Sequence, residues 1–297
     1  MNQFIGTGVA LITPFKKDLS IDFEALERLI EYNIENGTEY LVISGTTGES
    51  VTVTAQEKTE LVQFITKVNN GRLPLVLGIG GNNTASVVNE IISTDLADID
   101  AILSVSPYYS KPTQEGIYQH FKAVSEASPK PIILYNVPGR TSKNIEVETT
   151  LRLANDFDNI IAVKEAGNNV HQYLELLRTK PKDFLILSGD DDLALGVALA
   201  GGSGVISVIG QGLPKEFSEM IRLGIAGKAK EAYKLHFDLM PITGLIFAEN
   251  NPAGIKSVLE VLEISKANVR LPLVEATDQL KTKIKAALTD LGKVKLN

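Results

Sequence analysis

One lysine stands where a run of aliphatic residues predicts a buried strand. Lys164 directly follows Ile160–Val163. An ammonium group without a partner is costly to bury, so we expect this group to lose its proton. A neutral amine can attack a carbonyl carbon and form a Schiff base. The alternative is a structural lysine neutralised by Glu165 or by a neighbouring strand, although strand alternation sends Lys164 and Glu165 to opposite faces.

Other polar side chains come at the ends of apolar runs. Tyr135 ends one run, and Arg140 follows the Pro-Gly turn after it, where a guanidinium can clamp a carboxylate with two hydrogen bonds. Thr46 and Thr47 precede a glycine and offer hydroxyl groups beside an accessible backbone. Each of these residues has a structural alternative. Tyr135 could be a core residue, Arg140 a solvated loop residue, and the threonine pair a helix cap.

The sequence gives little support for a metal centre. The segment 190–192 is three consecutive Asp residues, but acidic residues commonly open a helix, and we expect that role here. The chain has no Cys, and its three His residues lie far apart. We therefore expect no metal, no disulfide and no Cys nucleophile.

These side chains can act together only in a fold that brings the ends of several strands close to one another. Short runs rich in Val, Ile and Leu alternate with amphipathic stretches, and eight runs predict strands over 8–15, 40–47, 74–81, 101–109, 131–138, 160–167, 184–191 and 204–210. This count predicts an α/β fold, a closed (β/α)8 TIM barrel with its active site at the carboxyl ends of the strands. An open doubly wound sheet is the alternative, but no Gly-x-Gly-x-x-Gly follows the first strand.

The strand pattern stops after residue 224. Helices are predicted over 226–237, 252–262 and 272–291. We therefore expect a catalytic barrel over 1–224 and a C-terminal helical region over 225–297.

Composition limits the partners of the chain. Its 297 residues carry 29 Lys and Arg against 36 Asp and Glu, a net charge of −7, which disfavours nucleic acid. The first residues lack the pattern of a signal peptide. The uncharged segment 193–213 contains too many glycines for a membrane span. We expect a cytoplasmic protein without a membrane or nucleic-acid partner.

Taken together, six strings resemble the dihydrodipicolinate synthase branch of the N-acetylneuraminate lyase superfamily over essentially the whole chain. They are GTTGES (45–50), SPYYSKPTQEG (106–116), YNVPGRT (135–141), VKEAGN (163–168), SGDD (188–191) and GGSGVISV (201–208). The resemblance implies a barrel with C-terminal helices and a homotetramer of tight dimers. It also implies condensation of pyruvate with aspartate semialdehyde in diaminopimelate and lysine biosynthesis, without a cofactor.

The resemblance also implies residue roles. Lys164 would form the Schiff base, and Tyr135 would move protons at the imine carbon. Thr46 would link Tyr135 to Tyr109, which would reach into the neighbouring subunit's site. The binding residues would be Thr47 for a carboxylate, Arg140 for the carboxylate of the semialdehyde, and Gly189 and Ile206 for the pyruvate pocket.

One departure concerns regulation. Many bacterial members of the family bind lysine through two histidines and a glutamate, whose positions here correspond to Ala55, Lys58 and Ser86. We therefore expect weak lysine inhibition or none.

Two other functions remain open from the sequence. Another pyruvate-dependent aldolase, acting on N-acetylneuraminate or a 2-keto-3-deoxy sugar acid, would share Lys164, but Arg140 favours a carboxylated aldehyde. A non-catalytic small-molecule sensor would have no use for a neutral amine beside hydroxyl groups.

Overall fold

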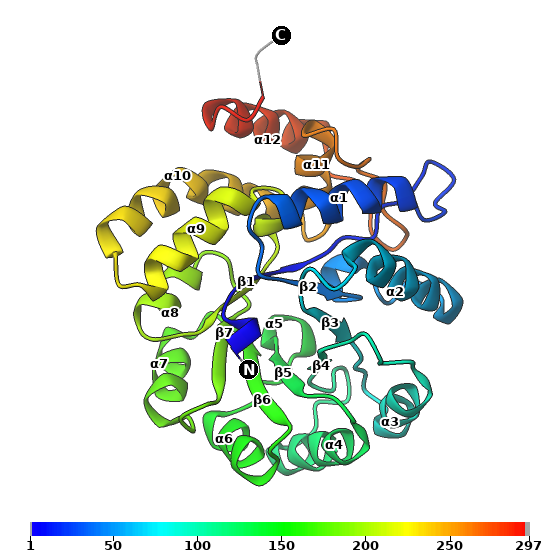
Figure 1. Cartoon of the computed structure of the whole chain (residues 1–297), viewed down its shortest axis with the longest axis vertical. Helices are drawn as coiled ribbons and strands as arrows, with labels where there is room; N and C mark the ends of the chain where they lie inside the picture. Colours follow the sequence, from blue (N-terminus) through cyan, green and yellow to red (C-terminus); the bar gives the residue numbers. More distant parts are fainter. Residues whose placement is uncertain (1, 295–297) are drawn as a thin grey trace.

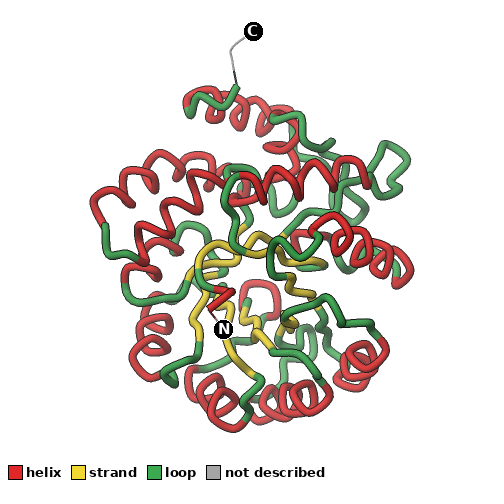
Figure 2. The backbone as a smooth tube through the Cα atoms, viewed as in Figure 1, coloured by secondary structure: helices red, strands yellow, loops and turns green. Residues whose placement is uncertain are grey.

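The computed structural model describes residues 2–294 of the chain. Eight parallel strands close into a barrel in chain order, with β8 pairing back to β1, and helices surround the ring of strands (Figure 2). The strands are β1 (Gly6–Ala10), β2 (Tyr40–Ile43), β3 (Leu75–Gly78), β4 (Ala101–Val105), β5 (Ile132–Asn136), β6 (Ile160–Glu165), β7 (Leu185–Ser188) and β8 (Gly204–Ser207). The predicted barrel is confirmed, and the open sheet is excluded.

Amphipathic helices cover the outside of the barrel. They are α1 (Phe23–Glu35), α2 (Ala55–Asn69), α3 (Thr84–Ser93), α4 (Gln114–Ala127), α6 (Val147–Asp156), α7 (Val170–Thr179), α8 (Ala194–Leu199) and α9 (Pro214–Ile225). Polar side chains fix where many of them begin. In α2, the Thr54 hydroxyl accepts from the Glu57 backbone while the Glu57 carboxylate accepts from the Thr54 backbone, which satisfies two otherwise unpaired N–H groups.

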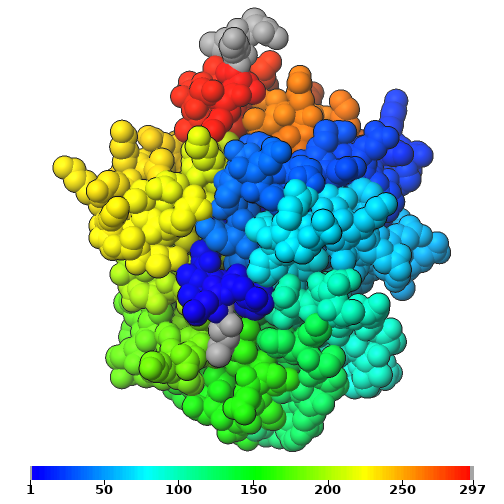
Figure 3. All heavy atoms as spheres, viewed as in Figure 1, coloured from blue at the N-terminus to red at the C-terminus, as the bar shows by residue number. Residues whose placement is uncertain are grey.

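The barrel is closed at the amino ends of its strands. A short 3-10 helix, η1 (Asn2–Phe4), buries Phe4 against Tyr40 with ring centroids 5.6 Å apart. Figure 3 shows this dark blue segment over the middle of the visible face. Side chains of several strands fill the interior behind it. A ligand must therefore enter from the carboxyl ends of the strands.

Three further helices follow α9: α10 (Ala229–Phe247), α11 (Ala253–Val261) and α12 (Asp278–Asp290). They lie along one side of the barrel, with α12 outermost (Figure 1). The predicted start of the last helix at residue 272 was wrong. The helix begins after Thr277, whose hydroxyl accepts from the Leu280 backbone, because a Thr cap competes well with a Pro start. The helix predicted to end at residue 237 also continues through Pro241 to Phe247.

Within residues 2–294, every helix is either too short or too polar to span a bilayer.

Candidate active site

A cavity of about 290 Å³ opens at the carboxyl ends of the strands. Six of the eight site residues expected from the sequence line it: Thr46, Thr47, Tyr135, Arg140, Lys164 and Gly189. Ile206 is not part of the lining and is fully buried in the barrel interior. Tyr109 also lies outside the cavity, with 89% of its surface exposed.

Lys164 extends into the barrel interior from β6. The residue is 6% exposed, and strand register places it opposite Tyr135 on β5. Its Nζ lies 4.4 Å from the centroid of the Tyr135 ring. Among residues 2–294, no carboxylate forms an ion pair with it. The predicted alternative of a lysine neutralised by Glu165 is therefore wrong.

Glu165 faces the outer helices. Its carboxylate accepts hydrogen bonds of 2.7 Å from Asn136 Nδ2, Gln172 Nε2 and the Gly167 backbone. Burial raises the pKa of this carboxyl, while the three donors oppose that rise. Asn136 also accepts from the Ile145 backbone at 2.9 Å. Glu165 thus joins β6 to the segment that follows Arg140.

Gly189 provides the space that the lysine side chain occupies. A Cβ at this position would lie 2.6 Å from Ala166 Cβ, 2.9 Å from Lys164 Cε and 3.1 Å from Lys164 Cγ. The first two distances are shorter than real Cβ contacts, and the third is tighter than most of them. A larger residue at position 189 would therefore displace Lys164.

The threonine pair forms a short 3-10 helix, η2 (Thr46–Gly48), after β2. Thr47 is 2% exposed, and its Oγ1 accepts from Asn251 Nδ2 at 2.9 Å. Asn251 lies between α10 and α11 and also lines the cavity. No sequence pattern singles it out, because it is 204 residues from Thr47.

The C-terminal region also anchors the residue after η2. The backbone of Glu49 adopts the left-handed conformation, with φ of 54°. Its buried carboxylate forms an ion pair with Lys256, which is fully buried. Lys256 Nζ donates to Asn268 O at 2.8 Å, and the Arg270 backbone donates to Glu49 at 2.9 Å. Burial lowers the pKa of Lys256 to about 8, against the opposing effect of Glu49.

The proton relay expected from the resemblance is not assembled within one chain. Among residues 2–294, no hydrogen bond joins Thr46, Tyr135 and Tyr109. The backbone of Tyr109 adopts the left-handed conformation, with φ of 69°, and its ring projects into solvent. The single chain therefore presents this tyrosine outward.

The expected helix cap was wrong: the acidic segment 190–192 accepts hydrogen bonds from nearby backbones, but α8 has no side-chain cap and no acidic residue in its first turn. Asp190 Oδ1 accepts from the backbones of Asp192 at 3.0 Å and Leu193 at 3.2 Å, just before α8. Buried Asp191 accepts from the backbone of Ile209 at 2.9 Å. No cluster of three or more metal-ligating side chains occurs in residues 2–294.

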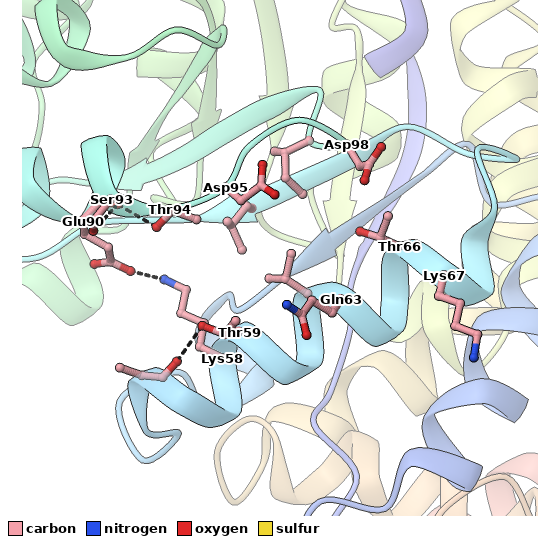
Figure 4. A pocket seen from close by; sticks show the side chains of 14 residues that line it. Lys58, Thr59, Gln63, Thr66, Lys67, Glu90, Ser93, Thr94, Asp95 and Asp98 are labelled. Atoms are coloured by element: carbon pink, nitrogen blue, oxygen red, sulfur yellow. Dashed lines mark hydrogen bonds and ion pairs between the residues drawn. The ribbon is translucent and has the colours of Figure 1, made fainter.

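A larger cavity, about 590 Å³, lies between α2 and α3, away from Lys164. Figure 4 shows Lys58 at one end of it, directed toward Glu90. Lys58 Nζ also donates to Gly78 O at 2.9 Å. This ammonium is therefore fixed between α2, α3 and the end of β3.

Comparisons with known proteins point to one family. The model of the dihydrodipicolinate synthetase family matches residues 3–291. A 4-hydroxy-tetrahydrodipicolinate synthase from Flavobacterium psychrophilum is 56% identical over 293 residues, covering 99% of this chain and 100% of the relative.

Solved structures agree. A dihydrodipicolinate synthase from Thermotoga maritima superposes with a TM-score of 0.96 at 36% identity, covering 98% of this chain and 100% of that one. A chloride-inhibited dihydrodipicolinate synthase from Acinetobacter baumannii, complexed with pyruvate, superposes with a TM-score of 0.95 at 37% identity, covering 98% and 99%.

Proposed function

The chain belongs to the dihydrodipicolinate synthetase family, and from this premise we propose how its cavity performs the family's reaction. The enzyme is a lyase that condenses pyruvate with L-aspartate 4-semialdehyde to 4-hydroxy-tetrahydrodipicolinate, in diaminopimelate and lysine biosynthesis. The observation that carries the mechanism is the buried amine of Lys164 on the cavity wall, which pairs with no carboxylate of residues 2–294.

Lys164 is the nucleophile in this mechanism. Its amine nitrogen attacks the ketone carbon of pyruvate, and loss of water gives an imine. Removal of a methyl proton gives an enamine, whose carbon attacks the aldehyde of the second substrate. The amine of that substrate then attacks the imine carbon, which closes the ring and frees Lys164.

The neighbouring groups bind and orient the two substrates. The Thr47 hydroxyl donates to the carboxylate of pyruvate, and Gly189 leaves room beside it. Arg140, which is exposed at the rim, receives the carboxylate of the semialdehyde. Tyr135 moves protons at the imine carbon, from its place beside Lys164.

Borohydride reduction in the presence of pyruvate, followed by peptide mass analysis, tests the mechanism. We expect an adduct on Lys164 that is absent from Lys164→Ala. Arg140→Ala should keep the adduct but impair use of the semialdehyde. An unmodified Lys164 in the active wild-type enzyme would refute the Schiff base, and turnover of N-acetylneuraminate in preference to the semialdehyde would refute the substrate assignment.

We also propose a homotetramer built from two kinds of contact. One apolar surface contains Val51, Leu271 and Val274, each at least 70% exposed, on two segments joined by a hydrogen bond from Arg270 to Thr52 O. A second surface lies around a cavity of about 230 Å³ between α7, α8 and α10, where Phe237 is 62% exposed. Two separate apolar surfaces support a dimer of dimers.

A further inference from the structure

Asn251 lines the cavity beside Lys164. Within residues 2–294, it is the lining residue with a buried polar side-chain atom that has no hydrogen-bond partner. The residue is 6% exposed. Its Nδ2 donates to Thr47 Oγ1 at 2.9 Å, which fixes the plane of the amide. Its Oδ1 is left as a buried acceptor without a donor.

An unsatisfied acceptor of this kind is costly in a folded protein. Its place on a ligand cavity indicates that the ligand supplies the missing hydrogen. The question is therefore which substrate can donate a hydrogen bond.

The chemistry of the two substrates gives an answer. Pyruvate ion has a carboxylate, a ketone and a methyl group, and none of them donates an N–H or O–H hydrogen bond. L-aspartate 4-semialdehyde carries an α-ammonium group, which has three donors. The Oδ1 atom of Asn251 matches the second substrate and not the first.

The carboxylates on the cavity wall are less suited to this role. Asp190 Oδ1 already accepts two backbone hydrogen bonds. Asp192 is exposed to solvent, where a charge pair is weakened by water. Asn251 is the buried acceptor, and a buried hydrogen bond discriminates more strongly between ligands with and without a donor.

We propose that Asn251 Oδ1 accepts a hydrogen bond from the α-ammonium group of L-aspartate 4-semialdehyde, and that this residue determines selectivity for an aldehyde bearing an amino group. The proposal rests on the proposed function. It assigns to the C-terminal helical region a direct part in choosing the second substrate, while pyruvate is held by groups of the barrel.

Succinic semialdehyde tests this contact, because it has the same carbon chain, aldehyde and carboxylate but no amino group. At saturating pyruvate, the KM for aspartate semialdehyde and the inhibition constant of succinic semialdehyde are measured for the wild type, Asn251→Leu and Asn251→Asp. Leu has a similar size without an acceptor, whereas Asp keeps an acceptor. Thermal unfolding confirms that each variant is folded.

The ratio of the two constants decides the outcome. We expect Asn251→Leu to reduce the preference for the amino-bearing aldehyde by roughly tenfold or more, and Asn251→Asp to preserve it. An unchanged ratio in Asn251→Leu, or an equal loss of preference in both variants, would overturn the proposal. Failure of the proposed function would be distinct, because the wild type would then form no pyruvate adduct on Lys164.

Discussion

At the scale of single residues, the position of the Lys164 side chain depends on a glycine that leaves it room. The absent Cβ of Gly189 would lie 2.9 Å from Lys164 Cε. We expect Gly189→Ala to slow pyruvate adduct formation by about 100-fold, because a displacement of about 1 Å can cost that much. Rapid-quench borohydride trapping measures this rate. Gly196→Ala on α8 meets nothing within 4 Å and is the control; equal rates in both variants would contradict the prediction.

The second residue-scale prediction concerns lysine. Free lysine would meet the fixed ammonium of Lys58, which already pairs with Glu90 and donates to Gly78 O, and like charges repel. We expect half-maximal inhibition only above about 1 mM lysine.

Steady-state assays with added lysine measure the inhibition. The triple variant Ala55→His, Lys58→His, Ser86→Glu should gain sensitivity, because it introduces the side chains that the resemblance associates with lysine binding. Sub-millimolar inhibition of the wild type would refute the expectation.

At the scale of elements, Asp191 joins the start of α8 to the end of β8. Its carboxylate accepts from the Val208 and Ile209 backbones at 3.0 and 2.9 Å. Burial nevertheless raises its pKa from 3.8 to about 6. Between these values the folded chain binds more protons than the unfolded chain, so this group's contribution to stability is full below about pH 4 and is lost as pH rises through about 6.

We therefore expect a pH-dependent difference between the wild type and Asp191→Asn, which keeps an acceptor but does not titrate. From about pH 4 to about pH 7, the wild type should lose up to about 3 kcal/mol of unfolding free energy relative to the variant. Urea unfolding at several pH values measures both proteins, and other titrating groups cancel in the difference. Parallel pH profiles would show that Asp191 is not responsible.

The boundaries of the helices and strands show where local sequence patterns are sufficient to predict an element and where they are not. The eight strands were predicted because burial on both faces requires continuous apolar runs. The start of α12 was predicted wrongly because Pro272 and Thr277 both suit the beginning of a helix. Thr277 is further held by Glu249, which accepts from its backbone at 2.8 Å. That contact joins α12 to a residue 28 positions earlier, so no local pattern contains it.

At the scale of the whole molecule, variants of Tyr109 can show whether one subunit contributes a residue to the active site of its partner. Lys164→Ala and Tyr109→Phe should each have low activity. If Tyr109 completes the partner's site, a mixed dimer of the two variants contains one site with both wild-type residues. Random mixing should therefore restore about a quarter of wild-type activity.

Mixing after mild dissociation and reassembly, followed by an activity assay, measures this complementation. Mixing Lys164→Ala with itself after the same treatment is the control. Activity no greater than the mean of the two separate variants would contradict a shared site.

Closure of the strands into a barrel instead of an open sheet was decided by the tertiary structure, but the sequence by itself predicted the eight strands, their alternation with helices and the strand that carries Lys164. These properties follow from local periodicity: apolar runs predict strands, and alternation separates Lys164 from Glu165. Most of the expected site residues reach one cavity for the same reason, because parallel strands of a barrel end on one face.

Only the tertiary structure decided what surrounds that cavity. It placed Asn251 against Thr47, paired Glu49 with Lys256 across 207 residues, and directed Tyr109 outward. Such contacts depend on how the C-terminal helices dock against the closed barrel. Side chains far apart in the chain carry no shared periodic signal, because their proximity arises only when separate elements pack together.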